Sequence, residues 1–334
     1  MIASVENPIY SAYIITSTKQ YNVTNALVSI DSNEQEKQIA ACATLILADV
    51  EVDGKMLSNL IKPRHRVIIK ANDGQKNDEV FRGYAWDIAP KESLTDNNIS
   101  IKSYDNLIYW QESQDYEFFS ANKSSKEIMK ALCKKWGIDL TYDYETCKHS
   151  TLVLRGCIAD FVTADVLTPA QNSSGKKYVI QSKKDRVYVT REGSNTTIYN
   201  IDKSNNAVEL RRYISMNGVT TQVIVMATSD DKEMTPIEAT VSGKTSEYGT
   251  LQKIVTRNED MTLAEAKKEA KNILDENGKP KWSYDVKAVD IPWIRKGDKV
   301  NINTNTLKGA FIVKSISREI SNRGKLMTLT VVDA

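Results

Sequence analysis

Short runs of alternating apolar and polar residues fill the first 115 positions of the chain. A period of two is typical of β-strands that bury one face. Turn-forming clusters such as Asn72-Asp73-Gly74 and Asp96-Asn97-Asn98 separate the runs. The pattern predicts strands at 9–15, 26–30, 42–47, 67–69 and 99–101, and only the stretch 40–47 also fits a helix.

A helical pattern begins at residue 124. Ser124 and Glu127 have the Ser-x-x-Glu spacing of a capping box, in which the two side chains satisfy free backbone amides at a helix start. Gly137 supplies a residue suited to the left-handed conformation that ends a helix. Between them, one face carries an apolar stripe formed by Ile128, Met129, Leu132 and Trp136.

A second, shorter helix is predicted from Thr163, carrying Val166 and Leu167, with Pro169 limiting its length. Residues Ser182-Lys183-Lys184-Asp185 are predicted to join two strands as a hairpin. The strands expected around the helices lie at 138–142, 152–154, 177–181 and 186–190. Residues 116–205 are therefore predicted to form a small α+β module inserted between β-rich parts, which we call the inserted module.

From Tyr213 the strand pattern returns, at 219–226, 237–241 and 250–255. One helix is predicted at about 262–275, with Thr262 and Glu265 as its capping box and Gly278 beyond its end. The last 40 residues again alternate as strands. The expected fold is α+β and mainly β, with β domains at 1–115 and 206–334 on either side of the inserted module.

The two β-rich parts share an internal echo. In each part a strand is followed by a second strand that contains Gly and Phe, then by a polar turn, and then by an alternating strand that ends in Asp. This order occurs at 65–105 and again at 298–333. In register, Ile99 matches Met327 and Ile101 matches Leu329, which predicts the same buried face in both. The alternative is that any two antiparallel meanders share such a pattern, but the shared order of elements favours related domains.

Composition narrows the possible functions. The 334 residues include 41% hydrophobic and 26% charged residues, which suits a globular protein of two or three domains. With 45 Lys+Arg against 43 Asp+Glu, the net charge of +2 does not favour a strongly basic nucleic-acid binder. The count of two His argues against most metal and triad chemistry.

The sequence also bears on compartment. The N-terminus lacks the basic and apolar regions of a secretory signal, so the protein is expected to fold in a cytoplasm. The longest apolar run, 39–48, is about half of the roughly 20 residues that a membrane span needs. With only four Cys, no structural disulfide is expected in a reducing compartment.

Acidic residues next to aromatic ones suggest a possible sugar cleft. Glu112, Asp115 and Glu117 lie beside Trp110, Tyr116 and Phe118, and glycoside hydrolysis needs two facing carboxylates. A solvated interdomain linker explains these acids more simply, and a hairpin loop explains Asp230, Asp231 and Glu233.

Cys133, Cys147, His149 and Cys157 would suit tetrahedral zinc chemically. Their spacing lacks a paired Cys-x-x-Cys. Cys133 lies one turn after Met129, near the apolar stripe, where a free cysteine behaves as a small hydrophobic residue. Nucleophile-elbow, phosphate-loop and His-Glu-x-x-His motifs are absent from the sequence. We therefore predict no catalytic, cofactor-binding or metal-binding residues, and no enzymatic activity.

Three stretches carry a family resemblance: 104–110 (YDNLIYW), 248–255 (YGTLQKIV) leading into the 262–275 helix, and 294–300 (IRKGDKV) followed by 309–313 and 327–329. In these stretches and their order the chain resembles baseplate hub proteins of contractile phage tails, specifically the PBSX-type prophage hub within the late control protein D superfamily.

The resemblance implies two related tube-type β domains, of barrel or sandwich form, around the inserted module. It also implies a homotrimeric ring whose six tube domains match a six-fold tail tube on one side and a three-fold spike on the other. The implied partners are the tail tube protein, the central spike protein and other baseplate proteins, with DNA only as passing cargo and no membrane insertion. The implied location is the virion tail baseplate, assembled in the bacterial cytoplasm.

Two further expectations accompany this assignment. A peptidoglycan hydrolase or wall-binding tail protein, with 110–205 as its active part, is the alternative function. The charge is also uneven: residues 1–115 carry 11 basic and 16 acidic side chains, 116–205 carry 14 and 10, and 206–334 carry 20 and 17. Part of the acidic excess in 1–115 is hypothesised to face a channel and repel passing DNA.

Overall fold

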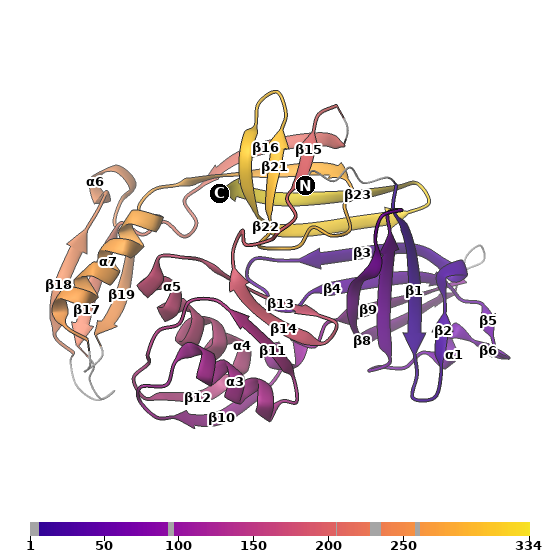
Figure 1. The fold of residues 1–334 in the computed structure, drawn as a ribbon, viewed down its shortest axis with the longest axis horizontal. Coiled ribbons are helices and arrows are strands. Elements are labelled where there is room, and N and C mark those ends of the chain that lie inside the picture. The colour runs from indigo at the N-terminus through magenta and orange to yellow at the C-terminus, as the bar shows by residue number, and fades with distance from the viewer. Residues whose placement is uncertain (1–6, 93–96, 205, 228–234, 258–260) are drawn as a thin grey trace.

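The computed structural model describes residues 7–92, 97–204, 206–227, 235–257 and 261–334. The fold is mainly β, as predicted, and is dominated by antiparallel strands (Figure 1). The described strands of one large sheet follow the order β16-β20-β23-β22-β3-β4-β9-β8-β7-β1-β2, with β21 on β22 and β15 on β21. This sheet contains strands from both ends of the chain.

The large sheet consists of β1 Ile9–Ile15, β2 Gln20–Asn22, β3 Leu27–Glu34, β4 Cys42–Ala48, β7 Arg66–Asn72, β8 Asn77–Glu92, β9 Asn97–Tyr104, β15 Tyr199–Asp202, β16 Ala207–Ser215, β20 Lys281–Val289, β21 Lys299–Asn303, β22 Lys308–Ser321 and β23 Gly324–Asp333. Short elements flank its first half: η1 Thr24–Ala26, β5 Glu51–Val52, β6 Lys55–Met56, α1 Leu57–Leu60 and α2 Ile108–Gln111. The stretch 42–48 is thus a strand. Asn97 and Asn98, predicted as a turn, belong to β9, and Asp96 lies outside the described residues.

The echo seen in the sequence corresponds to a repeated topology. In the first copy β3, β4, β7, β8 and β9 pair in the order β3-β4-β9-β8-β7, and in the second β16, β20, β21, β22 and β23 pair in the order β16-β20-β23-β22-β21. Chain order and pairing order are therefore the same in both copies. Ile99, Ile101, Met327 and Leu329 are all buried, which confirms the predicted common face.

Among the described residues, two of the three register shifts of the first copy repeat in the second. Trp86 is the extra residue where β8 pairs with β9, and Lys314 is the extra residue where β22 pairs with β23. The first bulge lies opposite Lys102 and Ser103, and the second lies opposite Thr330 and Val331. The alignment that matches Ile99 with Met327 also matches these two pairs of residues. A second pair of register shifts occurs at the starts of β3 and β16. Because bulges are specific insertions in a ladder, their coincidence favours duplicated domains over chance similarity.

The two copies are joined edge to edge. Residues Ile316–Ser321 of β22 pair with Ser29–Glu34 of β3, which makes the two sheets continuous. We call this pairing the seam. The hydrophobic cores nevertheless stay separate, one around Ile14, Leu45 and Ile101 and the other around Val286 and Leu329.

The inserted module lies against the seam region and has its own core around Trp110, Leu132 and Val166 (Figure 1). The helix predicted at 124–136 is confirmed as α3, with both hydrogen bonds of the Ser124–Glu127 capping box present. The elements of this region are β10 Gln114–Phe119, α3 Ser125–Lys135, β11 Asp139–Asp143, β12 Leu152–Cys157, α4 Ile158–Asp160, the π-helical η2 Phe161–Leu167, α5 Thr168–Ser174, β13 Tyr178–Lys183 and β14 Arg186–Arg191.

The helix predicted from Thr163 is longer than expected, and the prediction that Pro169 limits it was wrong. Helical structure runs continuously from Ile158 to Ser174, through the π-helical η2. Pro169 lies directly after the π-helical η2, in the first turn of α5, and its missing amide hydrogen removes one bond from the continuous helix. The wider π-helical turn before it accommodates the change of path.

Strands β17 Gln222–Ala227, β18 Ile237–Ser242 and β19 Gln252–Arg257 form a separate sheet covered by α7 Leu263–Asn277, with the short α6 Thr245–Tyr248 between β18 and β19. We call these elements the outer unit. Its core contains Val223, Val225, Ala266 and Ala270. Since Ser215 of β16 pairs with Lys281 of β20, the outer unit is an insertion at the hairpin equivalent to the β3–β4 turn. The predicted helix at 262–275 is confirmed, capping box included.

Candidate functional site

The acidic residues of the predicted sugar cleft lie on β10 and are ion-paired. Lys135 of α3 donates to Asp115 at 2.8 Å and to Glu117 at 2.9 Å, and Trp136 donates to Asp115 at 3.2 Å. The hydrogen bond from Lys135 lowers the pKa of Asp115, the opposite of what a general acid needs. Glu112 is exposed at the end of α2.

The aromatic residues do not line a cleft with these acids. Trp110 is completely buried in the core of the inserted module, while Tyr116 and Phe118 are exposed on the outer face of β10. Side chains alternate in direction along a strand, so Tyr116 and Phe118 point away from Asp115 and Glu117. The other predicted acidic group, Asp230, Asp231 and Glu233, lies outside the described residues.

The four residues of the possible zinc set are divided. Cys147 and His149 lie together, with the Sγ to Nε2 distance at 3.5 Å, and Ser125 is 2.9 Å from the same nitrogen. Cys157 instead contacts the carbonyl groups of Trp110 and Gln111. Burial raises the pKa of Cys133 to about 12, so that residue is a thiol. Within the described ranges, no group of three or more His, Cys, Asp or Glu side chains could hold a metal ion.

The structure concentrates charge elsewhere, where the first β domain, the inserted module and the last β domain meet. Arg295 lies between β20 and β21 and donates to Glu34 at the end of β3, a residue 261 positions away. Both side chains are about nine-tenths buried, at 12% and 9% exposure. Burial alone would raise the pKa of Glu34, but the guanidinium of Arg295 holds it below its ordinary value.

Further buried charges surround this pair. Lys296 donates to the carbonyl groups of Gln35 and Gln38, at 3.1 and 2.6 Å, and so fixes the β3–β4 turn. Asp105, at the end of β9, accepts from the amides of Ala41 and Leu107. Burial raises the pKa of Asp105 to about 7 despite these two hydrogen bonds.

A second buried network crosses the same seam. Arg318 of β22 donates to Asp290 at 3.0 Å and to the carbonyl of Ile294. Asp290 also accepts a hydrogen bond from Tyr10 of β1. The two ends of the chain are therefore connected by hydrogen-bonded charges, which confer geometric specificity because each partner is costly to leave unpaired.

The β13–β14 hairpin reaches into this junction from the inserted module. Lys184 and Asp185 at its tip both have positive φ, at 51° and 67°, as a tight hairpin turn requires. Asp185 accepts from Arg66 of β7 and, at 3.2 Å, from Arg82 of β8. Lys184 pairs with Asp78 at 2.7 Å. The predicted hairpin is confirmed, and its turn is one of the contacts between the module and the first β domain.

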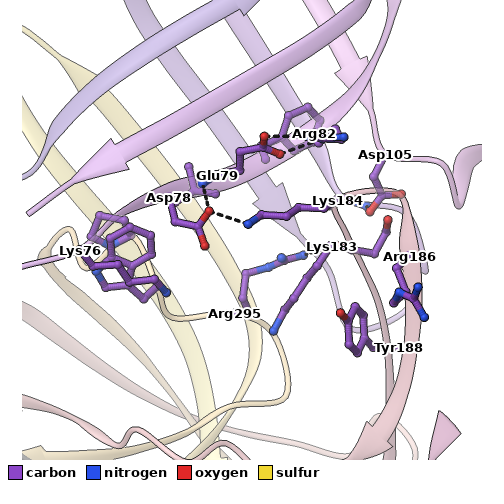
Figure 2. A pocket seen from close by; sticks show the side chains of 16 residues that line it. Lys76, Asp78, Glu79, Arg82, Asp105, Lys183, Lys184, Arg186, Tyr188 and Arg295 are labelled. Carbon is purple, nitrogen blue, oxygen red and sulfur yellow. Dashed lines mark hydrogen bonds and ion pairs between the residues drawn. The ribbon is translucent and has the colours of Figure 1, made fainter. Parts of the chain in front are cut away.

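Beside the hairpin lies a cavity of about 440 Å³. Its walls come from the start of β8, the hairpin and the loop 292–295, so all three parts of the chain contribute (Figure 2). Its charged lining residues are Lys76, Asp78, Glu79, Arg82, Asp105, Lys183, Lys184, Arg186 and Arg295. Burial, with the charge of Arg295 next, lowers the pKa of Lys183.

Sequence reasoning missed this charged junction. Residues 294–300 drew notice only for their family resemblance, although they place Arg295 and Lys296 between apolar residues. Arg and Lys are rarely buried without a partner, but a charged pair in a loop between strands gives no sign that it is buried. Their partners lie in β3 and its turn, and no local pattern identifies those.

The chain is similar to known proteins both in sequence and in fold. A family model described as YQBQ-like matches residues 61–332. The uncharacterized protein YqbQ of Bacillus subtilis (strain 168) is 23% identical over 263 residues, covering 77% of this chain and 79% of that protein.

Solved structures share the fold over nearly the whole chain. The 43 kDa tail protein of prophage MuSo2 from Shewanella oneidensis matches with a TM-score of 0.66 and 15% identity, covering 96% of this chain and 98% of that one. A tail protein from Neisseria meningitidis MC58 matches with a TM-score of 0.67 and 13% identity, covering 97% and 96%. The E. coli c3393 protein, a type VI secretion component described as similar to T4 tail proteins gp27 and gp5, matches at 0.57 with 8% identity, covering 92% and 73%.

Proposed function

Because the chain belongs to the YqbQ-like family and has the fold of phage tail proteins, we propose that it is a structural baseplate hub of a contractile phage or phage-like tail. In this proposal three copies form a ring that joins the tail tube to the central spike. We also propose that it belongs to the PBSX-type hubs.

The observation that supports this role most strongly is the duplicated sheet. Each chain carries the same strand order and the same bulge twice, joined edge to edge at the seam. Three copies would present six similar domains, which a six-fold tube requires, while the inserted module and outer unit occur once per chain and suit a three-fold partner. Rings close when the rotation between repeated head-to-tail contacts is a simple fraction of a turn.

The proposed partners follow from that geometry. The tail tube protein would contact the six similar domains, the central spike protein would sit on the three-fold side, and other baseplate proteins would contact the periphery. DNA would pass through the channel without specific binding, repelled by part of the acidic excess of residues 1–115. The proposed location is the virion tail baseplate, after assembly in the bacterial cytoplasm. Among the described residues, no helix is long and apolar enough to cross a membrane.

We propose that this role is non-enzymatic. The pairing of Asp115 and Glu117 with a single lysine supports this, since both acids are engaged and the hydrogen bond from Lys135 lowers the pKa of Asp115. Zymography on bacterial cell walls tests the hydrolase alternative. Clearing by purified protein that is lost in Glu117→Gln would overturn the non-enzymatic proposal.

The hub proposal is tested by molar mass in solution, measured by light scattering for the protein alone and mixed with its tube protein. A trimer, alone or in the mixture, is the expected result. A strictly monomeric species under both conditions would contradict the proposal.

An edge-strand variant sharpens this test. β16 ends the described path of the large sheet and exposes Val208 at 60%. Exposed edges invite pairing with another chain, so Val208→Asp is expected to weaken the trimer. Val50→Asp, at a residue 41% exposed beyond β4, is the matched control and should leave the trimer intact.

A further inference from the structure

We propose that the cavity beside the β13–β14 hairpin is a binding site for carboxylate groups of an acidic, aromatic-containing peptide segment from a partner protein. This inference holds whether or not the chain forms the proposed ring, because it rests on the cavity alone. The cavity volume of about 440 Å³ lies within the usual range for ligand sites.

The first argument is that two lysines in the cavity make no close ion pair, although Asp298 attracts Lys183 and Asp78 attracts Lys76 from farther away. Figure 2 shows Lys183 extending between Arg295 and Tyr188, and Lys76 at the opposite wall. Within the described part of the chain, neither ammonium group makes an ion pair. The Lys183 ammonium lies 5.8 Å from the ring centre of Tyr188, and that of Lys76 lies 4.1 Å from the ring centre of Trp293.

Most other charges of the cavity are already paired, and Asp105 accepts hydrogen bonds from the amides of Ala41 and Leu107. Glu79 holds Arg82 through two hydrogen bonds, at 2.7 and 2.8 Å, and Asp78 holds Lys184 at 2.7 Å. Arg186 is paired with Asp139 at 2.9 Å, and Arg295 with Glu34. The two free lysines therefore define the unmet charge of the site. Burial is the main cause of the lowered pKa of Lys183, and repulsion from Arg295 adds to it while Asp298 and Glu34 oppose it.

The second argument concerns the kind of anion. Phosphate sites are usually built from Arg forks or from backbone amides at a helix start or nest. Here the Arg forks are occupied by carboxylates, and the free groups are flexible lysines, which act as point charges. Asp78 and Glu79 at the wall would repel a polyanion. An isolated carboxylate fits this arrangement better than phosphate or nucleic acid.

The third argument concerns the remaining walls. Trp293, Tyr188, Phe81 and Pro292 provide aromatic and apolar surface next to the free lysines. Trp293 is held in place because its Nε1 donates to Asp73 at 2.6 Å. A peptide that carries an aromatic residue between two acidic ones would match both features. Its binding would also tie the hairpin to β8 and to the loop 292–295.

The test uses the full-length protein and the acetylated, amidated peptide Asp-Phe-Glu-Leu, with calorimetry at low salt. The matched peptide Asn-Phe-Gln-Leu and inorganic phosphate are the comparison ligands. We expect the acidic peptide to bind with a Kd on the order of 1 mM or tighter, and at least about tenfold more tightly than either comparison ligand. No binding, equal binding of the two peptides, or tighter binding of phosphate would overturn the proposal.

Variants locate the site. Lys183→Gln and Lys76→Gln should each weaken acidic-peptide binding about tenfold, because each removes one of the two free charges. Lys55→Gln changes an exposed lysine of β6 and is the matched control, expected to bind as the parent protein does. Equal binding by Lys183→Gln and Lys55→Gln would contradict the assignment, and unchanged thermal midpoints would show that all variants fold.

Discussion

At the scale of single residues, the ion pair of Glu34 and Arg295 illustrates how the chain uses buried charge. The two side chains come from opposite halves of the sequence and meet at the seam. A buried pair adds little net stability compared with apolar residues of the same volume, but losing one partner leaves an uncompensated charge. The pair therefore acts mainly against alternative arrangements of the two β domains.

Glu34→Gln should accordingly be strongly destabilising, by about 3 kcal/mol in the free energy of unfolding measured with urea. Glu36→Gln is the matched control two residues along the chain. The Glu36 side chain is 55% exposed. Its partner Lys314 also pairs with Glu192 and would retain that ion pair in the variant. A loss below about 1 kcal/mol is expected for that variant, and similar losses in both would refute a special role for Glu34.

The pH dependence of stability should report Asp105. Its pKa is about 7 in the folded protein and near 4 when unfolded. The folded state therefore binds the proton more tightly, so this contribution to stability is complete below pH 4 and is lost as the pH rises through 7.

Asp105→Asn should reduce the change in the free energy of unfolding between pH 4 and 7 by at least about 1 kcal/mol. Urea unfolding across this pH range measures the change. Asp298→Asn is the comparison, since burial raises the pKa of Asp298 to only about 6. An Asp105→Asn profile with the same slope as the parent protein would contradict the assignment.

At the scale of elements, the repeated bulges connect the two β domains to the inserted module. Trp86, the bulge residue of β8, packs against Tyr104 and Tyr109 at ring distances of 6.1 and 5.8 Å. Lys314, the bulge residue of β22, pairs with Glu192 just after β14 at 2.6 Å. A bulge re-aims a side chain out of the regular alternation. Equivalent positions in the two copies thus both contact the module, Trp86 by packing against its core and Lys314 by charge.

Helix capping offers a test at the same scale. Ser124→Ala removes the side chain that accepts from the amide of Glu127 and should destabilise the protein by about 1 kcal/mol. Ser124→Asp keeps an acceptor at the cap and should lose much less. The comparison is the urea midpoint of the two variants, and equal losses would show that the cap does not stabilise α3.

At the scale of the whole molecule, the described chain has four cores, two on the continuous large sheet and two in the inserted module and the outer unit, which have smaller sheets of their own. The cores of the two β domains, the inserted module and the outer unit are distinct clusters. Contacts between the module and the outer unit include the hydrogen bond from Asn172 to Glu269 at 2.9 Å. The chain enters the outer unit from β16 and leaves it into β20, as Figure 1 shows.

This architecture predicts that the outer unit can be removed. Replacing residues 216–280 by an Asn-Gly turn would connect Ser215 to Lys281, which already face each other across β16 and β20. The shortened protein should keep a cooperative thermal transition and the β-type circular dichroism of the remainder. Loss of cooperative unfolding would show that the outer unit is needed for the sheet to fold.

The sequence by itself determined the local elements. The capping boxes at Ser124 and Thr262, the hairpin ending at Asp185 and the alternation of 99–101 and 327–329 depend on residues close together in the chain, so each was predictable from spacing. The echo of 65–105 in 298–333 was also visible, because duplicated strands bury the same face. The reach of the helix past Pro169 was not, because a π-helical turn leaves no clear period in the sequence.

Only the tertiary structure decided how these elements combine. The seam of β3 with β22, the shared bulges and the position of the outer unit depend on pairing between strands far apart in the chain. The same is true of the charged junction, where Glu34 meets Arg295 across 261 positions. The spacing of residues along the chain does not identify such partners, because hydrogen bonds and ion pairs depend on distance in space. The cavity with its two unpaired lysines exists only because three parts of the chain converge there.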